Sequence, residues 1–163
     1  IWACAKHNGP IYLRLGKAGE PNLTNDAPEP FEFKKIRKIK EGSGIAIIGY
    51  GPILSMAFEA AEHYKKKTGT ETAIFSAHTI KPLDIDRIKS LLKEYKRIIV
   101  LEECTPKGSL ASQVKEIAWD EQASCIIRSL SLQDEFIKCY GTRVELLGAH
   151  GVTVDALINQ LEN

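Results

Sequence analysis

The sequence lacks the features that mark zinc-binding, membrane and nucleic-acid-binding proteins. None of its four cysteines stands in a C-x-x-C pair, which disfavours a zinc site. No apolar run approaches the roughly 20 residues that cross a bilayer, and these residues show no secretory signal pattern. Lys plus Arg number 22 and Asp plus Glu 21, so the formal net charge of +1 favours neither nucleic acid nor an anionic membrane as a partner. We therefore expect a cytoplasmic protein with reduced thiols in its core.

What the sequence does contain is one ordinary globular domain with a piece of another before it. Its 163 residues, 44% of them hydrophobic, suffice for a full core. Residues 16–31 hold two glycines, three prolines and two asparagines without apolar periodicity, which is typical of a linker. We therefore predict a tail and linker in 1–30, with a helix end in 1–9 and a short strand in 10–15, and a complete domain in 31–163. Because the chain begins at Ile1 without methionine, we expect it to be part of a longer protein.

Beyond the linker, short apolar runs alternate with helical patterns. Residues 35–40 (KIRKIK) alternate apolar and basic side chains, which is typical of a strand at a sheet edge. Apolar runs predict further strands at 45–48, 72–77, 97–101 and 125–130. Apolar residues at helical spacing predict helices that begin near Pro52, Asp84, Gly108 and Thr153, with Asp84 and Thr153 as N-caps. The alternation predicts an α/β fold of three layers, in which helices cover both faces of a mostly parallel sheet.

Two turns at predicted strand ends hold residues of the types that bind ligands in α/β proteins. Gly49-Tyr50-Gly51 is similar to the start of a dinucleotide-binding fingerprint, but Leu54 stands where its third glycine belongs, so we favour a tight turn. His78 and Lys81 follow the next strand and are suited to an anionic substrate. The alternative is that Asp84 caps a helix and His78 is merely exposed, and the residues alone favour this alternative.

Two more polar positions are read as structural. Glu102 and Glu103 leave a strand in opposite directions, so we expect one to face solvent and the other to cap backbone N–H groups near Gly108. His150 is a lone histidine before the last helix. No metal-spaced histidine pair occurs.

Taken in order, these segments resemble the transketolases and deoxyxylulose-phosphate synthases. Residues 9–17 (GPIYLRLGK) resemble the last strand of their pyrimidine-binding domain. Their C-terminal domain is matched in sequence by 44–51 (GIAIIGYG), 78–84 (HTIKPLD), 102–103 (EE) with 108–112 (GSLAS), 134–136 (DEF) and 150–152 (HGV). The resemblance covers essentially all 163 residues.

The resemblance implies a fold and a reaction. The fold is a five-stranded mixed sheet of order 1-3-2-4-5, with KIRKIK as an antiparallel strand 1. In the full-length enzyme, thiamine diphosphate and Mg²⁺ would move a two-carbon unit from a ketose phosphate to an aldose. Arg14 and Lys17 fall at positions similar to those that meet the sugar phosphate in relatives, although arginine is commoner at the place of Lys17 and lysine lacks the bidentate fork.

The resemblance also implies that this chain is inactive alone and binds no cofactor. The family holds the diphosphate and Mg²⁺ with a Gly-Asp-Gly motif, and no Asp-Gly dipeptide occurs here. We expect the missing N-terminal and pyrimidine-binding domains, or a subunit that carries them, as partners, together with a homodimer. The alternatives are the C-terminal part of a deoxyxylulose-phosphate synthase, or a docking module like that of 2-oxo-acid dehydrogenase E1β subunits. The pair Arg14 and Lys17 favours a sugar-phosphate enzyme over the dehydrogenase.

Overall fold

The computed structural model describes residues 1–16 and 19–163. One sheet is formed by β1 (Arg37–Lys40), β2 (Ile45–Gly49), β3 (Ala73–Ser76), β4 (Arg97–Leu101) and β5 (Ile126–Leu130). The helices are α1 (Trp2–Lys6), α2 (Leu54–Thr68), α3 (Ile85–Glu94), α4 (Leu110–Asp120), α5 (Arg143–Ala149) and α6 (Val154–Glu162), with a 3-10 turn η1 (Gly51–Ile53) before α2.

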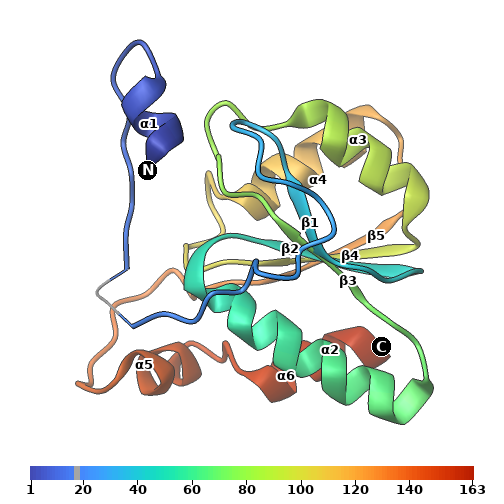
Figure 1. Ribbon diagram of the computed structural model, residues 1–163. Helices are drawn as coiled ribbons and strands as arrows, with labels where there is room; N and C mark the ends of the chain where they lie inside the picture. Colours follow the sequence, from blue (N-terminus) through green and yellow to red (C-terminus); the bar gives the residue numbers. More distant parts are fainter. Residues whose placement is uncertain (17–18) are drawn as a thin grey trace.

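The sheet has the order β1-β3-β2-β4-β5. Strands β2, β3, β4 and β5 run parallel, and β1 pairs antiparallel with β3 at one edge. Helices α3 and α4 cover one face, while α2, α5 and α6 lie on the other (Figure 1). The predicted three-layer α/β fold, the strand order and the antiparallel edge strand are all confirmed.

Strand alternation divides the interior into two cores, one on each face of the sheet. In β4, Ile98 and Val100 pack toward α3 and α4, whereas Ile99 and Leu101 pack toward α2 and α6. All four side chains are fully buried, and each stabilises the fold by about 1.5–3 kcal/mol through the apolar surface removed from water. A strand that is apolar on both faces belongs inside a covered sheet, and β4 lies there, between β2 and β5.

Side-chain caps hold the helix ends as the sequence predicts. Asp84 accepts the N–H of Arg87 at 3.3 Å to start α3, and Thr153 accepts the N–H of Ala156 at 3.1 Å to start α6. Gly69 ends α2 in the left-handed conformation, with φ of 73°. The short helix α5, which begins at a capping box, was not predicted.

The N-terminal segment, residues 1–16, departs from the prediction. A helix end is present as α1, but residues 10–15 form no strand, and Tyr12 is 90% exposed. A strand needs a neighbouring ladder to satisfy its N–H and C=O groups, and none of the five described strands pairs with this segment. The described residues of 16–31 are irregular, as predicted, and the division into domains at residue 30 stays a prediction.

The prediction of core thiols is wrong in one respect. All four cysteines are free thiols, but Cys139 is exposed and the other three are only partly buried. The interior is filled instead by aliphatic side chains and Phe75. Among the described residues, no helix is long and apolar enough to cross a membrane.

Candidate functional site at the carboxyl edge of the sheet

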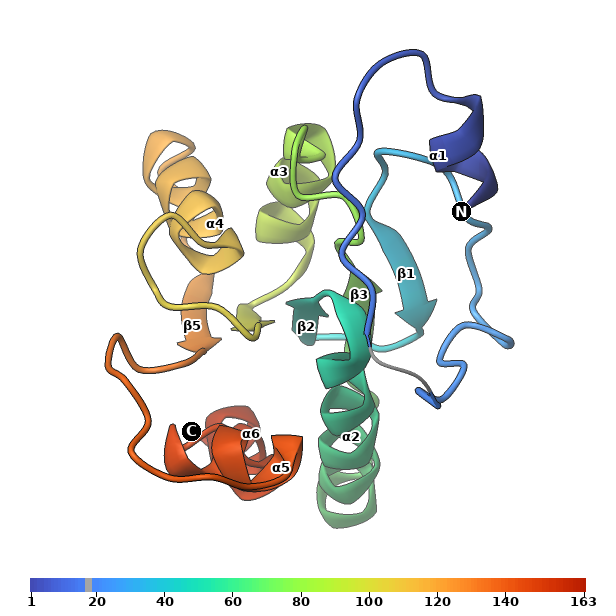
Figure 2. The same cartoon turned by 90° about the vertical axis from the view of Figure 1, so that its left-hand side faces the viewer.

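The carboxyl ends of the parallel strands bring several polar residues to one edge of the sheet. Tyr50 follows β2, His78 lies two residues beyond β3, and Glu102 follows β4. Figure 2 views the molecule from the side where these strand ends and the N-terminal segment lie. In open α/β sheets, ligands collect at this edge.

The turn after β2 is shaped by the sheet, with no sign of a pyrophosphate cradle. A Cβ added at Gly49 would lie 2.5 Å from the carbonyl oxygen of Leu101, so the close backbone approach that requires glycine is made to β4. Gly51 then takes a φ of 73°, and Pro52 occupies the first turn of η1. The reading of Gly49-Tyr50-Gly51 as a tight turn into a packed helix accounts for both glycines.

Glu102 is a fully buried carboxylate with a structural task. It accepts the backbone N–H of Leu110 and of Ala111, each at 3.0 Å, in the first turn of α4. A carboxylate is favoured there because the free N–H groups and the helix dipole give a partial positive charge. The prediction that one carboxylate of the Glu102-Glu103 pair caps backbone groups near Gly108 is confirmed.

Tyr50 adds a third donor to Glu102 and brings the N-terminal segment into the site. Its hydroxyl donates to Glu102 at 3.4 Å. Burial, followed by the negative charge of Glu102 and the neighbouring Cys104, raises the pKa of Tyr50 to about 12, while Arg14 acts to lower this pKa. Tyr50 therefore stays protonated at neutral pH, and the exposed Arg14 lies near enough for its charge to act at this edge.

His78 is held against the linker and is not simply exposed. Its ring stacks on Phe31 with 4.7 Å between centroids, and Nδ1 lies 3.0 Å from the Thr79 hydroxyl. Nε2 is buried and makes no hydrogen bond of good geometry with the described residues, although the backbone of Lys35 lies close enough to oppose part of the pKa shift. Burial, and then the positive charge of Arg37, lowers the pKa of His78, so the ring is neutral at pH 7.

The other predicted site residues are dispersed. Lys81 is exposed, and no hydrogen bond or ion pair links it with His78 in the described part of the chain. Lys17 lies outside the described residues. Glu103 forms an ion pair with Arg143.

His150 accepts the N–H of Gln133 at 3.2 Å, which agrees with its structural reading. No group of three or more His, Cys, Asp or Glu residues that could hold a metal ion occurs in 1–16 or 19–163.

Sequence reasoning missed two partners in this site. Phe31, which stacks on His78, was assigned only to the linker, and the donor role of Tyr50 was not foreseen. The aromatic residue in an otherwise polar, proline-rich segment was the available signal for Phe31.

Together, the mixed five-stranded sheet and a carboxyl edge whose buried acid caps a helix define a three-layer α/β domain, a class of fold that does not by itself assign a function. The family model described as "Transketolase, C-terminal domain" matches residues 34–157. The chain belongs to the transketolase C-terminal domain family.

Curated relatives carry the same domain inside much longer chains. The chain is 30% identical over 154 residues to the 1-deoxy-D-xylulose-5-phosphate synthase of Phocaeicola vulgatus, covering 94% of this chain and 24% of that protein. It is 32% identical over 158 residues to the synthase of Natranaerobius thermophilus, covering 96% and 25%. The chain thus spans about a quarter of the length of the curated relatives it matches.

Solved structures share the fold. A split-gene transketolase, described as an inactive "beta4" tetramer (a name unrelated to strand β4), superposes with a TM-score of 0.83 at 24% identity. The match covers 99% of this chain and 51% of that one. The transketolase of Campylobacter jejuni superposes with a TM-score of 0.59 at 15% identity, over 85% of this chain and 20% of that one.

Proposed function

We propose that this chain is the C-terminal supporting domain of a thiamine-diphosphate-dependent transketolase, which transfers a two-carbon ketol unit between sugar phosphates in the cytoplasm. The chain itself is inactive. The observation that carries the proposal is the family match over residues 34–157. Residues 1–30 are the tail of the pyrimidine-binding domain and its linker in this proposal, and 31–163 are the C-terminal domain.

The cofactor, thiamine diphosphate with Mg²⁺, supplies the electron sink for C–C cleavage when it is bound by the rest of the enzyme. This chain contributes Arg14 and Lys17 to the substrate phosphate. The closeness of Arg14 to Tyr50 supports a place for Arg14 at the carboxyl edge. His78 and Lys81 are candidates for further substrate contacts, and the lowered pKa of His78 makes its contact a hydrogen bond rather than an ion pair.

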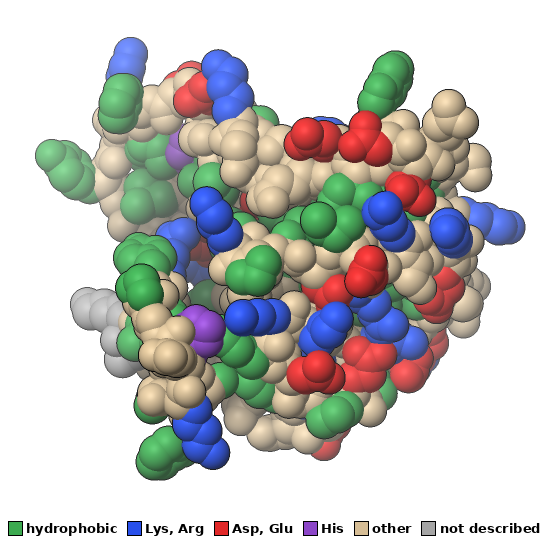
Figure 3. All heavy atoms as spheres, turned by 90° about the horizontal axis from the view of Figure 1, so that it is seen from above, with side chains coloured by type: hydrophobic (Ala, Val, Ile, Leu, Met, Phe, Trp, Pro, Cys, Tyr) green, Lys and Arg blue, Asp and Glu red, His purple; other side chains and the backbone are tan. Residues whose placement is uncertain are grey.

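Exposed hydrophobic side chains on the surface support the proposal that further domains or subunits bind this chain. Large hydrophobic side chains stand in solvent in the N-terminal segment and in the loop that leads to α5: Trp2, Tyr12, Phe136 and Tyr140 are each at least 80% exposed. Figure 3 shows hydrophobic side chains gathered on the side of the N-terminal segment, while acidic and basic side chains mingle elsewhere. Exposed apolar groups of this kind mark protein interfaces, so the upstream domains, or a subunit that carries them, and a second copy are the proposed covers.

Deoxyxylulose-phosphate synthase is the second candidate activity, and the names of the curated relatives favour it. Complementation separates the two. The chain is mixed with the upstream part of its own gene product, and ketol exchange between sugar phosphates is measured beside formation of deoxyxylulose 5-phosphate. Whichever product forms identifies the activity, and the absence of both would contradict the proposal.

The cofactor assignment has its own test. Calorimetry of the isolated chain with Mg²⁺ and thiamine diphosphate is expected to show no heat above dilution. Micromolar binding would contradict the placing of cofactor groups upstream.

A further inference from the structure

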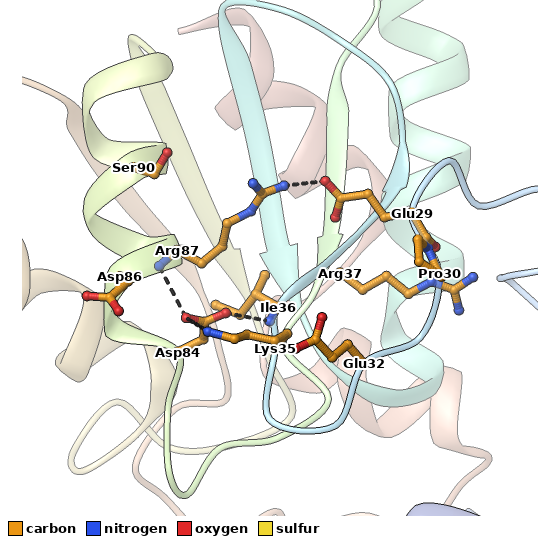
Figure 4. A pocket seen from close by; sticks show the side chains of 10 residues that line it. All are labelled: Glu29, Pro30, Glu32, Lys35, Ile36, Arg37, Asp84, Asp86, Arg87 and Ser90. Carbon is orange, nitrogen blue, oxygen red and sulfur yellow. Dashed lines mark hydrogen bonds and ion pairs between the residues drawn. The ribbon is translucent and has the colours of Figure 1, made fainter.

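Residues 29–36, which we call the strap, lead from the linker into β1. Glu29 makes the shortest of the strap's contacts. One of its carboxylate oxygens accepts the backbone N–H of Lys38 at 2.6 Å, and the other accepts Nη2 of Arg87 at 2.6 Å. Its carbonyl oxygen accepts Nε of Arg37 at 2.6 Å. Glu29 therefore ties the strap to the edge strand and to α3 at once, as Figure 4 shows for Arg87.

The two partners of the Glu29 carboxylate are fixed by the domain. The guanidinium of Arg87 lies 5.3 Å from the centre of the buried Phe75 ring, and the backbone N–H of Arg87 is bound to Asp84. The Lys38 N–H belongs to an edge strand, where no further strand of the sheet accepts it. The domain thus places the Arg87 guanidinium beside a backbone N–H that no described strand accepts, and the carboxylate of Glu29 binds both.

A cavity of about 410 Å³ lies between the strap and the start of α3 (Figure 4). Its lining includes three basic and four acidic residues, so it offers no field of one sign to a charged ligand. Several of these charges are already paired, because Arg87 binds Glu29 and Lys35 lies 3.6 Å from Asp84. The Ile36 N–H also donates to Asp84, at 3.1 Å. The ion pairs and hydrogen bonds that line the cavity thus connect the strap to the rest of the domain.

Aromatic contacts continue from the strap in two directions. Phe31 stacks on His78 at the carboxyl edge of the sheet. Phe33 meets the ring of His7, directly after α1, edge-on at 5.5 Å. The strap therefore contacts the candidate site on one side and the N-terminal segment on the other.

We propose that Glu29 is a positioning residue of the complete enzyme: by locking the strap on the domain, it fixes the direction from which residues 10–16 approach the carboxyl edge, and Arg14 with them. The role of Arg14 rests on the proposed function. The attachment of the strap through Glu29 to Lys38 and Arg87, which we call the lock, is a property of the chain and is tested separately.

The lock is tested on the 163-residue chain. Nitroxide labels at the exposed positions 12 and 63, in a variant whose four native cysteines are replaced by alanine, report the distance between the N-terminal segment and α2. Glu29→Ala is expected to broaden the distance distribution. Glu29→Gln, which keeps an oxygen for the Lys38 N–H but loses the charge facing Arg87, should broaden it less.

A matched control removes a similar ion pair elsewhere. Glu121 lies 2.7 Å from Lys89, with a side chain 28% exposed, against 2.6 Å and 35% for Glu29 with Arg87. Glu121→Ala should leave the distribution unchanged. Equal widths in Glu29→Ala and the unmutated chain would overturn the lock.

The positioning role is tested in the complete enzyme. Glu29→Ala is expected to lower kcat/KM for phosphorylated sugars about tenfold, at the lower end of the roughly ten- to hundredfold that loss of one charged phosphate contact costs. The loss should fall on KM, with kcat and cofactor affinity retained, and Glu29→Gln should recover part of it. Normal kinetics beside a broadened distribution would overturn the positioning role and leave the proposed function standing. If the unmutated complete enzyme turns over no sugar phosphate, the proposed function and the role of Arg14 fall, and the spin-label result still decides the lock.

Discussion

The hydroxyl of Tyr50 and the backbone N–H of Leu110 bind the same carboxylate oxygen of Glu102, at 3.4 and 3.0 Å. Tyr50 leaves β2 and Glu102 leaves β4, so this oxygen joins two neighbouring strand ends to the first turn of α4. A buried carboxylate is costly unless its oxygens are satisfied, and here they are. Glu102 therefore belongs to the framework of the domain, although it lies where ligands usually bind.

Glu102→Ala is expected to destabilise the chain. The change leaves two buried N–H groups and the Tyr50 hydroxyl without their acceptor. Loss of a charged hydrogen bond of this kind costs about 1.5–3 kcal/mol, and the three losses add up to less than their sum. We expect the free energy of unfolding to fall by about 2–4 kcal/mol in urea denaturation. Glu103→Ala is the control, because its surface pair with Arg143 contributes about 0–1 kcal/mol. Equal losses in the two variants would contradict the framework role.

His78 makes stability depend on pH. Its folded-state pKa lies below the ordinary histidine pKa of about 6.5, because burial and then the positive charge of Arg37 disfavour the imidazolium. Between the folded-state and unfolded-state pKa, the unfolded chain therefore binds a proton that the folded chain does not. This part of the stability is complete above about pH 6.5 and is lost as the pH falls toward the folded-state pKa. In His78→Gln the same pH window should show a flatter curve of unfolding free energy. Superimposable curves would indicate that the ring is solvated as in the unfolded chain.

In the complete enzyme, Lys17→Ala is expected to weaken the use of phosphorylated sugars. Loss of one charged phosphate contact costs about 1.5–3 kcal/mol, roughly ten- to a hundredfold in kcat/KM. Arg14→Ala should have the same or a larger effect, since a guanidinium binds phosphate through two N–H groups. Comparison of phosphorylated with unphosphorylated sugars provides the control. Equal losses for both substrate types would assign these residues to packing.

The sequence predicts the sheet well because its signals are local. Four apolar runs, such as that of β2, and the alternation of KIRKIK are visible within a few residues. The capping box of α5 was equally local, since Thr142 and Glu145 stand at the T-x-x-E spacing, and the helix was missed for want of a long apolar stripe. The strand expected at 10–15 failed because a strand exists only with a partner ladder, which propensity does not report.

The candidate site was less predictable because its contacts are distant in sequence. Glu29 and Arg87 are separated by 58 residues, and Tyr50 and Glu102 by 52. The cap at Glu102 was foreseen because Gly108 and the helix follow within ten residues. No pattern within the linker indicates that Glu29 binds Lys38 of β1 and Arg87 of α3, because these two partners are brought together only by the fold.

The loop that leads to α5 exposes a surface suited to self-association. Phe136, Tyr140 and Val144 are exposed by 96%, 106% and 73% in and beside the loop that leads to α5, an apolar surface with no cover in the described chain. The formal net charge of +1 opposes pairing only weakly. We therefore expect a weak or moderate homodimer through the C-terminal domain, with a two-fold contact that both copies build from the same surface.

Sedimentation equilibrium over a wide concentration range measures this association. Phe136→Asp with Tyr140→Asp should shift the chain to monomer without loss of stability, because both side chains are already exposed. Trp119→Asp is the matched control: Trp119 is 84% exposed on α4, on the opposite face of the sheet from α5, and its replacement should leave the association unchanged. A chain that stays strictly monomeric at hundreds of micromolar would place dimerisation of the parent enzyme in its upstream domains, and the aromatic loop would then be a surface for those domains alone.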